Sequence, residues 1–357
     1  MTKSIDKILV IRLSSIGDIL LSTPIFRALR AQFPDAEIDV LVKTHFVELL
    51  RFNPHISSVL EIGAAGSKDL IQVTRQIRSE RYDLIIDLHN SLRSRIIRWF
   101  SGAPEIRVVD KRVRERFILV NAGKNLYGKP VSVTDRYFET VADFAVVNDG
   151  DPLEIHVPQA LHDEVNGQLT DMGIRAHGPV IALAPAARHE TKMWPADRFE
   201  ALAVEVSRKY HAQIVVLGGK DDRLYCENIV RSVTEHLGVD MVFNLAGSFS
   251  LLGTAVVLDR CSILVSNDSG LMHLAAARKK PVVAIFGPTV EEFGFFPYGT
   301  RSIVVEQEGL PCRPCSHLGG ERCPKRHFRC MLDTPVGQVA QEIAALLPHQ
   351  PHPAQTH

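Results

Sequence analysis

The stretch Ile263-Leu-Val-Ser-Asn-Asp-Ser-Gly-Leu-Met-His-Leu-Ala-Ala-Ala277 decides the fold class of this chain. An apolar run typical of a buried strand leads through a small polar turn directly into a helical pattern. The start of a helix has unpaired backbone N–H groups and partial positive charge, so it favours anions such as phosphate. A well-capped helix is the alternative interpretation, because strand-turn-helix junctions occur throughout α/β proteins.

A second junction of the same kind lies near the other end of the chain. Residues 7–13 read as a buried parallel strand, Ser14-Ser-Ile-Gly-Asp18 forms a polar turn, and an amphipathic pattern covers 19–32. Two such junctions indicate two similar α/β halves. The length supports this, because 357 residues exceed what one hydrophobic core usually organises.

Composition narrows the class of protein. Apolar residues make up 45% of the chain and charged residues 23%, as in an ordinary globular protein. The formal net charge is zero, so nothing in the overall charge favours nucleic acid as a partner. No segment has the roughly 20 apolar residues that a membrane span needs, and Arg12 and Asp18 interrupt the N-terminal apolar run. We therefore expect a cytoplasmic protein, with peripheral membrane contact at most.

Strands and helices alternate along the chain, which predicts parallel sheets with right-handed crossovers. We expect strands at 7–13, 37–42, 58–62, 83–87, 105–109, 153–157, 180–184, 213–217, 241–245, 263–266 and 281–286. Helical patterns cover 18–32, 44–51, 68–80, 91–100, 135–147, 159–172, 196–210, 222–237, 250–260 and 270–278.

These patterns divide the chain into domains. We expect an N-terminal Rossmann-like domain at 1–172 and a C-terminal one at 173–335, with a linker near 173–179. A helix at 336–348 would pack back toward the N-terminal domain, and the Pro- and His-rich tail 349–357 would fray. Ligands of open α/β sheets bind outside the carboxyl ends of the strands, so the site is expected in a central cleft between the two sheets.

Three stretches of this sequence resemble one family of enzymes. They are Arg12-Leu-Ser-Ser-Ile-Gly-Asp-Ile-Leu-Leu-Ser-Thr-Pro24, Lys192-Met-Trp-Pro195, and Asn267-Asp-Ser-Gly-Leu-Met-His-Leu274 with the following Pro281-Val-Val-Ala-Ile-Phe-Gly-Pro288. Their order and sequences resemble those of the lipopolysaccharide heptosyltransferases, bacterial glycosyltransferases of the two-domain GT-B architecture. The resemblance implies ADP-heptose as donor, an anionic core-oligosaccharide acceptor on lipid A, and no cofactor or metal.

The C-terminal half would hold the donor. The resemblance implies that Lys192 contacts donor phosphate or sugar, and that Ser269, Gly270 and His273 hold the diphosphate. Ser14, Ser15 and Gly17 of the N-terminal junction would meet the phosphates when the domains close. The other residues that we assign to the donor site lie in the C-terminal half: Thr191, Asp221, Asp222, Gly247 and Asp268. An acidic residue just past the second strand often accepts hydrogen bonds from ribose hydroxyls, but Asp221 and Asp222 fit the N-cap of the next helix equally well.

The chemistry would fall to Asp18. Transfer of a sugar with inversion requires a base that takes the proton of the acceptor hydroxyl, and positive charge that stabilises the departing diphosphate. The local sequence alone favours Asp18 as a helix N-cap, whereas the resemblance implies that it is the general base. Lys192 and the helix start at Ser269 could stabilise the leaving group, and no Asp-x-Asp pair of the kind that binds a divalent ion lies at a strand end in the first half.

Basic residues concentrate between 93 and 116. This surface suits an anionic acceptor, although a solvated basic face is the alternative. The residues that we assign to acceptor binding are Arg93, Arg95, Lys111, Arg112 and Arg114.

Four cysteines cluster near the C-terminus, at positions 312, 315, 323 and 330. Structural zinc, a disulfide and free thiols all remain open for Cys312, Cys315, Cys323 and Cys330, whereas Cys226 and Cys261 read as core residues.

The sequence and its resemblance to this family thus predict a monomer that is an inverting heptosyltransferase acting on Kdo-lipid A or heptosyl-Kdo-lipid A. Three alternatives stay open: a relative that uses another sugar or acceptor, a nucleotide-sugar epimerase of the same fold, and a non-catalytic nucleotide-sugar binding protein.

Overall fold

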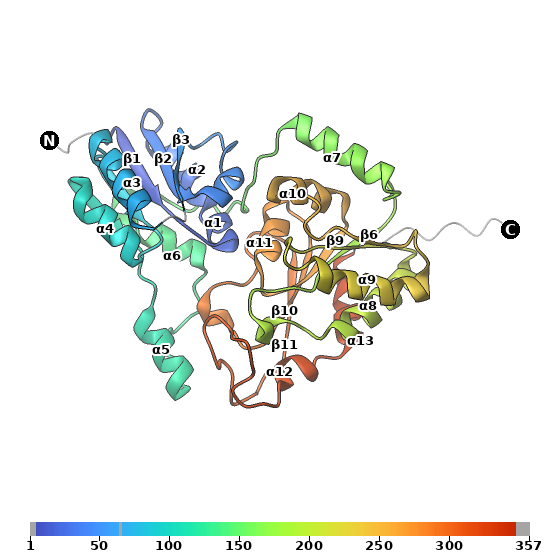
Figure 1. The fold of residues 1–357 in the computed structure, drawn as a ribbon. Coiled ribbons are helices and arrows are strands. Elements are labelled where there is room, and N and C mark those ends of the chain that lie inside the picture. The colour runs from blue at the N-terminus through green and yellow to red at the C-terminus, as the bar shows by residue number, and fades with distance from the viewer. Residues whose placement is uncertain (1–4, 64–65, 348–357) are drawn as a thin grey trace.

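Two parallel β-sheets organise the chain in the computed structural model, which describes residues 5–63 and 66–347. The five-stranded sheet has the order β3-β2-β1-β4-β5 and the six-stranded sheet the order β11-β10-β9-β6-β7-β8, and every strand pair is parallel. Figure 1 shows the sheets in separate halves, each with helices around it. This arrangement confirms the predicted α/β class with two Rossmann-like units.

The N-terminal sheet consists of the five strands expected there: β1 (Lys7–Ile11), β2 (Glu37–Lys43), β3 (Ser58–Ile62), β4 (Leu84–Asp87) and β5 (Glu105–Val108). Its central strands are mostly apolar and buried, as a sheet covered by helices on both sides requires, with Asp39 and Asp87 as buried charged exceptions. The surrounding helical elements are α1 (Ile16–Leu20), α2 (Thr23–Gln32), the 3₁₀ helix η1 (Thr44–Leu49), α3 (Ser67–Glu80), α4 (Leu92–Ser101), α5 (Val113–Ala122), α6 (Val133–Glu139) and η2 (Ala142–Phe144).

The helix expected at 18–32 is two helices. Pro24 lies in the first turn of α2, where its ring is tolerated, but in one continuous helix it would clash with the carbonyl group of Leu20. The Ser22 hydroxyl donates to the carbonyl oxygen of Ile19 at 2.7 Å and helps to end α1. The helix at α5 was not predicted, and the helix expected at 135–147 is shortened to α6 with the short η2 behind it.

The C-terminal sheet holds β6 (Val180–Ala184), β7 (Gln213–Val216), β8 (Val242–Asn244), β9 (Ile263–Asn267), β10 (Val282–Phe286) and β11 (Ser302–Glu306). Five of these strands were predicted, whereas the edge strand β11 was not. The other elements of this half are α7 (Gln159–Asp171), η3 (Glu190–Lys192), α8 (Ala196–Tyr210), α9 (Arg223–Leu237), α10 (Leu251–Arg260), α11 (Gly270–Ala277), η4 (Glu291–Phe293), α12 (Arg329–Leu332) and α13 (Val336–Leu346). No described helix is long and apolar enough to cross a bilayer.

The chain crosses between the halves earlier than expected. Helix α7, which we assigned to the domain 1–172, packs against α10 of the C-terminal half through the buried Val165 and Leu169. Residues 153–157 are extended but join no sheet, so the strand expected there is absent. The crossover is therefore this extended segment, and 173–179 is a turn inside the C-terminal half.

The last helix was also assigned to the wrong neighbour. We expected 336–348 to pack toward the N-terminal domain, but α13 packs on α8 and on β9, β10 and β11. Its apolar stripe, which is Val339, Ala340, Ile343 and Leu346, joins the core of the C-terminal sheet. An amphipathic stripe requires an apolar partner but does not specify which one. The tail predicted at 349–357 lies outside the described residues.

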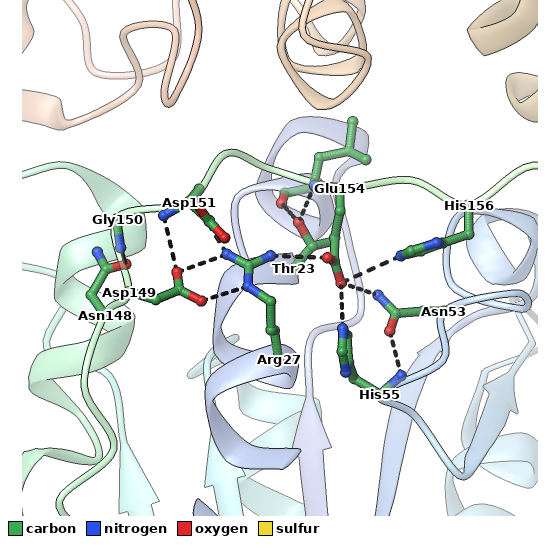
Figure 2. A network of polar contacts seen from close by, with 11 residues as sticks. Thr23, Arg27, Asn53, His55, Asn148, Asp149, Gly150, Asp151, Glu154 and His156 are labelled. Atoms are coloured by element: carbon green, nitrogen blue, oxygen red, sulfur yellow. Dashed lines mark hydrogen bonds and ion pairs between the residues drawn. The ribbon is translucent and has the colours of Figure 1, made fainter. Parts of the chain in front are cut away.

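A polar network fixes the start of the crossover to the N-terminal half (Figure 2). Arg27 of α2 reaches across and pairs with Asp149 at 2.6 Å and with Glu154 at 2.9 Å. Glu154 also accepts a hydrogen bond from Asn53 at 2.8 Å. The bidentate guanidinium geometry holds the segment in one direction as it leaves the N-terminal sheet.

Candidate functional site

The two strand-turn-helix junctions meet face to face. Helices α1 and α11 pack against each other, and a glycine at each contact makes the approach possible. A Cβ atom on Gly17 would lie 2.6 Å from the ring of His273, and one on Gly270 would lie 2.9 Å from the Ile16 side chain. Both glycines are required by close packing of backbone against side chain. The loops that carry Asp18 and Asp268 therefore belong to one site.

Asp18 lies in the first turn of α1 and is held from two sides. Its carboxylate accepts hydrogen bonds from the Ser15 backbone N–H at 3.1 Å and from the Ser15 hydroxyl at 2.8 Å. The other oxygen forms an ion pair with the buried Arg12. Burial opposes the charged carboxylate, but the Arg12 charge and the Ser15 hydrogen bonds outweigh it and keep the pKa of Asp18 below its usual value. Asp18 is therefore ionised at neutral pH.

Arg12 links Asp18 to the end of the neighbouring strand. Its guanidinium donates to the Leu88 carbonyl oxygen and lies 5.7 Å from the centroid of the Tyr137 ring. Just beyond it, His89 projects from the carboxyl end of β4, and its Nδ1 has no hydrogen-bond partner among the described residues. Burial, with the Arg12 and Lys111 charges, lowers the pKa of His89 to about 3, so this imidazole is neutral.

Sequence reasoning missed His89 and assigned no role in the site to Arg12, although Arg12 begins one of the stretches that resemble the family. Both could have been found from the rule that placed Asp18, since His89 follows a buried strand by two residues and Arg12 interrupts an apolar one. Buried Asp87 organises this corner by accepting the backbone N–H groups of His89 and Asn90 at 2.9 and 2.7 Å.

On the opposite side of the junction, Lys192 and Asp268 form a close ion pair. The Lys192 ammonium lies 2.6 Å from Asp268 Oδ2, and the Thr289 hydroxyl donates to the same oxygen at 2.8 Å. Asp268 is 9% exposed and the Lys192 side chain 14% exposed, so the pair is largely shielded from water. The structure thus brings together residues from the loops after β6, β9 and β10.

The loop after β9 is positioned by its own strand and by Trp194. Asn267 accepts the Trp194 backbone N–H at 3.0 Å and donates to the Pro185 carbonyl oxygen at 2.7 Å, which ties the loops after β6 and β9 together. The Ser269 side chain makes no capping bond to α11 and lies 3.1 Å from the Ser266 hydroxyl. The first N–H groups of α11 are therefore free of a side-chain cap, as an anion site requires.

His273 is buried in α11 between the two junctions. It is 2% exposed, and its Nδ1 has no hydrogen-bond partner among the described residues. Burial lowers the pKa of His273 to about 4, because the nearby carboxylates compensate only partly for lost hydration. The ring is therefore neutral, and its Nδ1 is a buried polar atom without a partner among the described residues.

Thr191 anchors the Lys192 loop to the loop that contains Gly320. Its backbone N–H and its hydroxyl both donate to the Gly320 carbonyl oxygen at 3.0 Å, and the hydroxyl accepts the Gly320 N–H at 2.8 Å. A Cβ atom on the adjacent Gly319 would lie 2.8 Å from His189. Thr191 is thus a positioning residue that holds the loop carrying Lys192.

The loops after β7 and β8 carry the remaining residues that the sequence assigned to the donor site. Asp222 occupies the N-cap position of α9 and its side chain accepts the Gly219 N–H at 2.8 Å, whereas Asp221 is exposed. Gly247 has φ +68°, and a Cβ atom there would lie 2.7 Å from the Lys220 backbone. The geometry therefore gives Asp222 a structural partner and leaves the carboxylate of Asp221 exposed.

The basic residues assigned to the acceptor do not form one cluster. Lys111 lies beside Arg12, and its pKa is lowered by burial and by that neighbouring charge. Arg112 is engaged by Glu139 at 2.8 Å. Arg95 and Arg114 are exposed, and Arg93 on α4 is half-buried.

All six cysteines are free thiols, and among the described residues no group of three or more His, Cys, Asp or Glu could hold a metal ion. Cys312 Sγ lies 3.7 Å from His327 Nε2. Cys226 and Cys261 are buried, as expected of core residues.

Comparison with known proteins identifies the family. Residues 70–322 match the family model of glycosyltransferase family 9 (heptosyltransferase). The chain is 32% identical over 359 residues to lipooligosaccharide heptosyltransferase 2 of Haemophilus ducreyi, covering 96% of this chain and 99% of that protein.

Solved structures agree with the fold. The crystal structure of the glycosyl transferase family 9 protein from Veillonella parvula superimposes with a TM-score of 0.80 at 22% identity, covering 97% of this chain and 98% of that one. The structure of E. coli ADP-heptose lps heptosyltransferase II gives a TM-score of 0.74 at 25% identity, with 95% and 98% covered. The GT-B architecture is thereby confirmed, and the chain belongs to glycosyltransferase family 9, the heptosyltransferase family.

Proposed function

We propose that this protein transfers L-glycero-D-manno-heptose from ADP-heptose to the inner core of lipopolysaccharide, with Kdo-lipid A or heptosyl-Kdo-lipid A as acceptor. Family membership supports the sugar transfer, and the names of the relatives support the lipopolysaccharide acceptor. One observation carries the mechanism: α1, which holds the ionised Asp18, packs against α11, and Asp268 in the turn before α11 pairs with Lys192.

The donor occupies the C-terminal loops in this proposal. The diphosphate lies at the uncapped start of α11, where the N–H groups of Ser269 and Gly270 and the Nδ1 of neutral His273 face it. Lys192 moves its ammonium group from Asp268 to the diphosphate and stabilises the charge that develops as ADP leaves. Asp221 accepts hydrogen bonds from the ribose, because Asp222 is already used by the Gly219 N–H.

The acceptor lies on the N-terminal side. Its hydroxyl oxygen attacks the anomeric carbon, its proton passes to Asp18, and the bond between that carbon and the diphosphate oxygen breaks, which inverts the anomeric configuration. Arg12 keeps Asp18 charged and correctly turned while lowering its basicity. Lys111 and His89 face the acceptor, with Arg93, Arg95, Arg112 and Arg114 as the outer basic surface for its carboxylates and phosphates.

No bound metal takes part in this proposal, because Lys192 and the N–H groups of α11 already supply positive charge at the leaving group. We place the reaction at the cytoplasmic face of the inner membrane, where a lipid-anchored acceptor would be presented.

A mass-spectrometric transfer assay tests the proposal. The purified protein is mixed with ADP-heptose and a heptose-deficient lipid A core, with and without EDTA. We expect the acceptor to gain the mass of one heptose equally in both tubes. Loss of the product in EDTA would contradict the metal-independent mechanism, and turnover of ADP-heptose without an acceptor would indicate an epimerase instead.

A further inference from the structure

Exposed large apolar side chains concentrate in one part of the N-terminal half. Of the fourteen in the described residues, six fall between positions 92 and 126: Leu92, Trp99, Phe100, Val113, Phe117 and Leu126. Scattered single apolar residues are normal on a protein surface, whereas a concentration of this kind indicates an interaction site.

Helix α5 has little contact with the rest of the protein. Leu119 is its one buried residue, and Figure 1 shows the helix projecting from the body of the molecule. Val113 and Phe117 are four residues apart, on one face, and are 56% and 66% exposed. A helix with so small a buried stripe has apolar surface left for a partner.

Helix α4 also has large exposed apolar side chains on one face. Leu92 and Trp99 are seven residues apart, which puts them on the same helical face, and they are 72% and 74% exposed. The exposed Arg95 lies between them on this face. In Figure 1, α4 lies at the left edge of the N-terminal half and α5 projects below that half.

Positive charge accompanies the apolar side chains. Residues 111–129 contain six Lys or Arg and a single acidic residue, Glu115, in a chain whose formal net charge is zero. Arg114, Arg116 and Lys124 have no ion-pair partner in the part of the chain that the structure describes. Large apolar side chains interleaved with unpaired cations are the composition of proteins that bind at the surface of anionic membranes.

We propose that the α4–α5 surface, defined by Leu92, Trp99, Phe100, Val113 and Phe117 with the surrounding basic residues, docks on an anionic phospholipid bilayer. The apolar side chains enter the headgroup region while Arg116, Lys124 and Lys129, none of which we assign to the acceptor, contact lipid phosphates. A second copy of the chain is a poorer occupant, because a symmetric contact would bring the same positive charges together. The inference does not depend on which sugar or acceptor the enzyme uses.

The two tryptophans make the proposal directly measurable. Trp99 is 74% exposed and Trp194 is fully buried, so a change of emission on membrane binding reports on Trp99. We expect a blue shift, together with cosedimentation, when the protein meets vesicles of phosphatidylethanolamine and phosphatidylglycerol. Vesicles of phosphatidylcholine alone should give at least tenfold weaker binding. The Trp99→Phe variant should still sediment with the anionic vesicles but lose the shift.

Two variants and one control separate the contributions. Trp99→Ser/Phe117→Ser should lower the partition coefficient for anionic vesicles at least tenfold, and Lys124→Glu/Lys129→Glu should lower it severalfold and weaken its dependence on salt. Leu224→Ser on α9 removes an equally exposed apolar side chain, at 74%, outside this surface and should change binding less than twofold.

Three results would overturn the proposal. One is wild-type protein that stays in the supernatant with anionic vesicles, and another is equal loss of binding in the Leu224→Ser control. The third is a dimer in sedimentation velocity that the Trp99→Ser/Phe117→Ser variant abolishes, because this would identify the surface as a contact between copies.

Discussion

The β1–α1 and β9–α11 junctions have the same design, yet their helix starts differ in what already occupies them. At α1, Asp18 accepts the N–H and hydroxyl of Ser15 and pairs with Arg12 from its own strand. At α11 no side chain caps the helix. The first helix start therefore holds a fixed carboxylate, whereas the second leaves its N–H groups to an incoming anion.

The cations of the two junctions also differ: the one at the first junction is fixed, and the one at the second can move. Arg12 is 6% exposed and is held by Asp18, the Leu88 carbonyl oxygen and the Tyr137 ring, so it has no freedom to leave. Lys192 approaches Asp268 on a flexible side chain from the loop after a different strand. We infer a division of work in which the N-terminal junction supplies the base and the C-terminal junction binds the leaving group.

Asp18→Asn should have the largest effect. The amide keeps the size of the side chain but cannot take a proton, so kcat is expected to fall about 10²–10⁴-fold. KM for the donor should stay within about twofold. Steady-state transfer assays measure both values, and near-normal kcat in the folded variant would break the proposed division of work.

Lys192→Ala should act on the other junction. We expect kcat/KM for the donor to fall about 10²–10³-fold, because the variant loses charge stabilisation of the diphosphate and leaves Asp268 without its cation. Lys209→Ala, which removes an exposed ammonium group from α8, is the matched control and should stay within about twofold. If Lys192→Ala changed kcat/KM no more than this control, Lys192 would have no role at the donor.

Gly17→Ala tests the contact between the junctions. The added methyl group would lie 2.6 Å from the His273 ring, so we expect a loss of about 1–3 kcal/mol in the free energy of unfolding. Gly167→Ala in α7 meets no atom within 4 Å and should be neutral or slightly stabilising. Denaturant titration compares the two, and equal stability would show that the helices are not packed this closely.

His273 should make stability depend on pH. Its folded pKa of about 4 lies below the value of 6.5 for an unperturbed histidine, so the unfolded state binds the proton first as the pH falls. This group alone should lower the free energy of unfolding by about 2 kcal/mol between pH 7 and pH 5. His273→Gln should therefore lose that much less stability over this range. Urea titrations at the two pH values measure this loss. If wild type and His273→Gln lost the same free energy of unfolding between pH 7 and pH 5, the imidazole would not be buried and neutral.

The sequence predicted the parts of the molecule that depend on local pattern. Runs such as Ile263–Val265 are apolar on both faces, so they indicated buried parallel strands, and the polar turns behind them indicated the site loops. Strand β11 was missed because it is a partly exposed edge strand that follows Arg301 and ends in the charged Glu306. Helix α5 was missed because it has no one-sided apolar stripe.

Most of the remaining errors concern which elements pack together, and not whether a helix or strand is present. The patterns of α7 and α13 correctly indicated helices, but the residues of an apolar stripe do not encode which sheet or helix they meet. The pairing of Lys192 with Asp268 and the neighbourhood of Arg12 and His89 likewise arise from strands that are distant in the sequence. These contacts required the three-dimensional arrangement.

Donor binding tests the division of work most directly. Calorimetric titration of ADP-heptose into wild-type, Asp18→Asn and Lys192→Ala proteins needs no acceptor and no turnover. The account predicts that Asp18→Asn binds the donor as tightly as wild type, whereas Lys192→Ala binds at least tenfold more weakly. Equal weakening in both variants, or weakening in Asp18→Asn alone, would contradict the assignment of the base and the donor site to separate junctions.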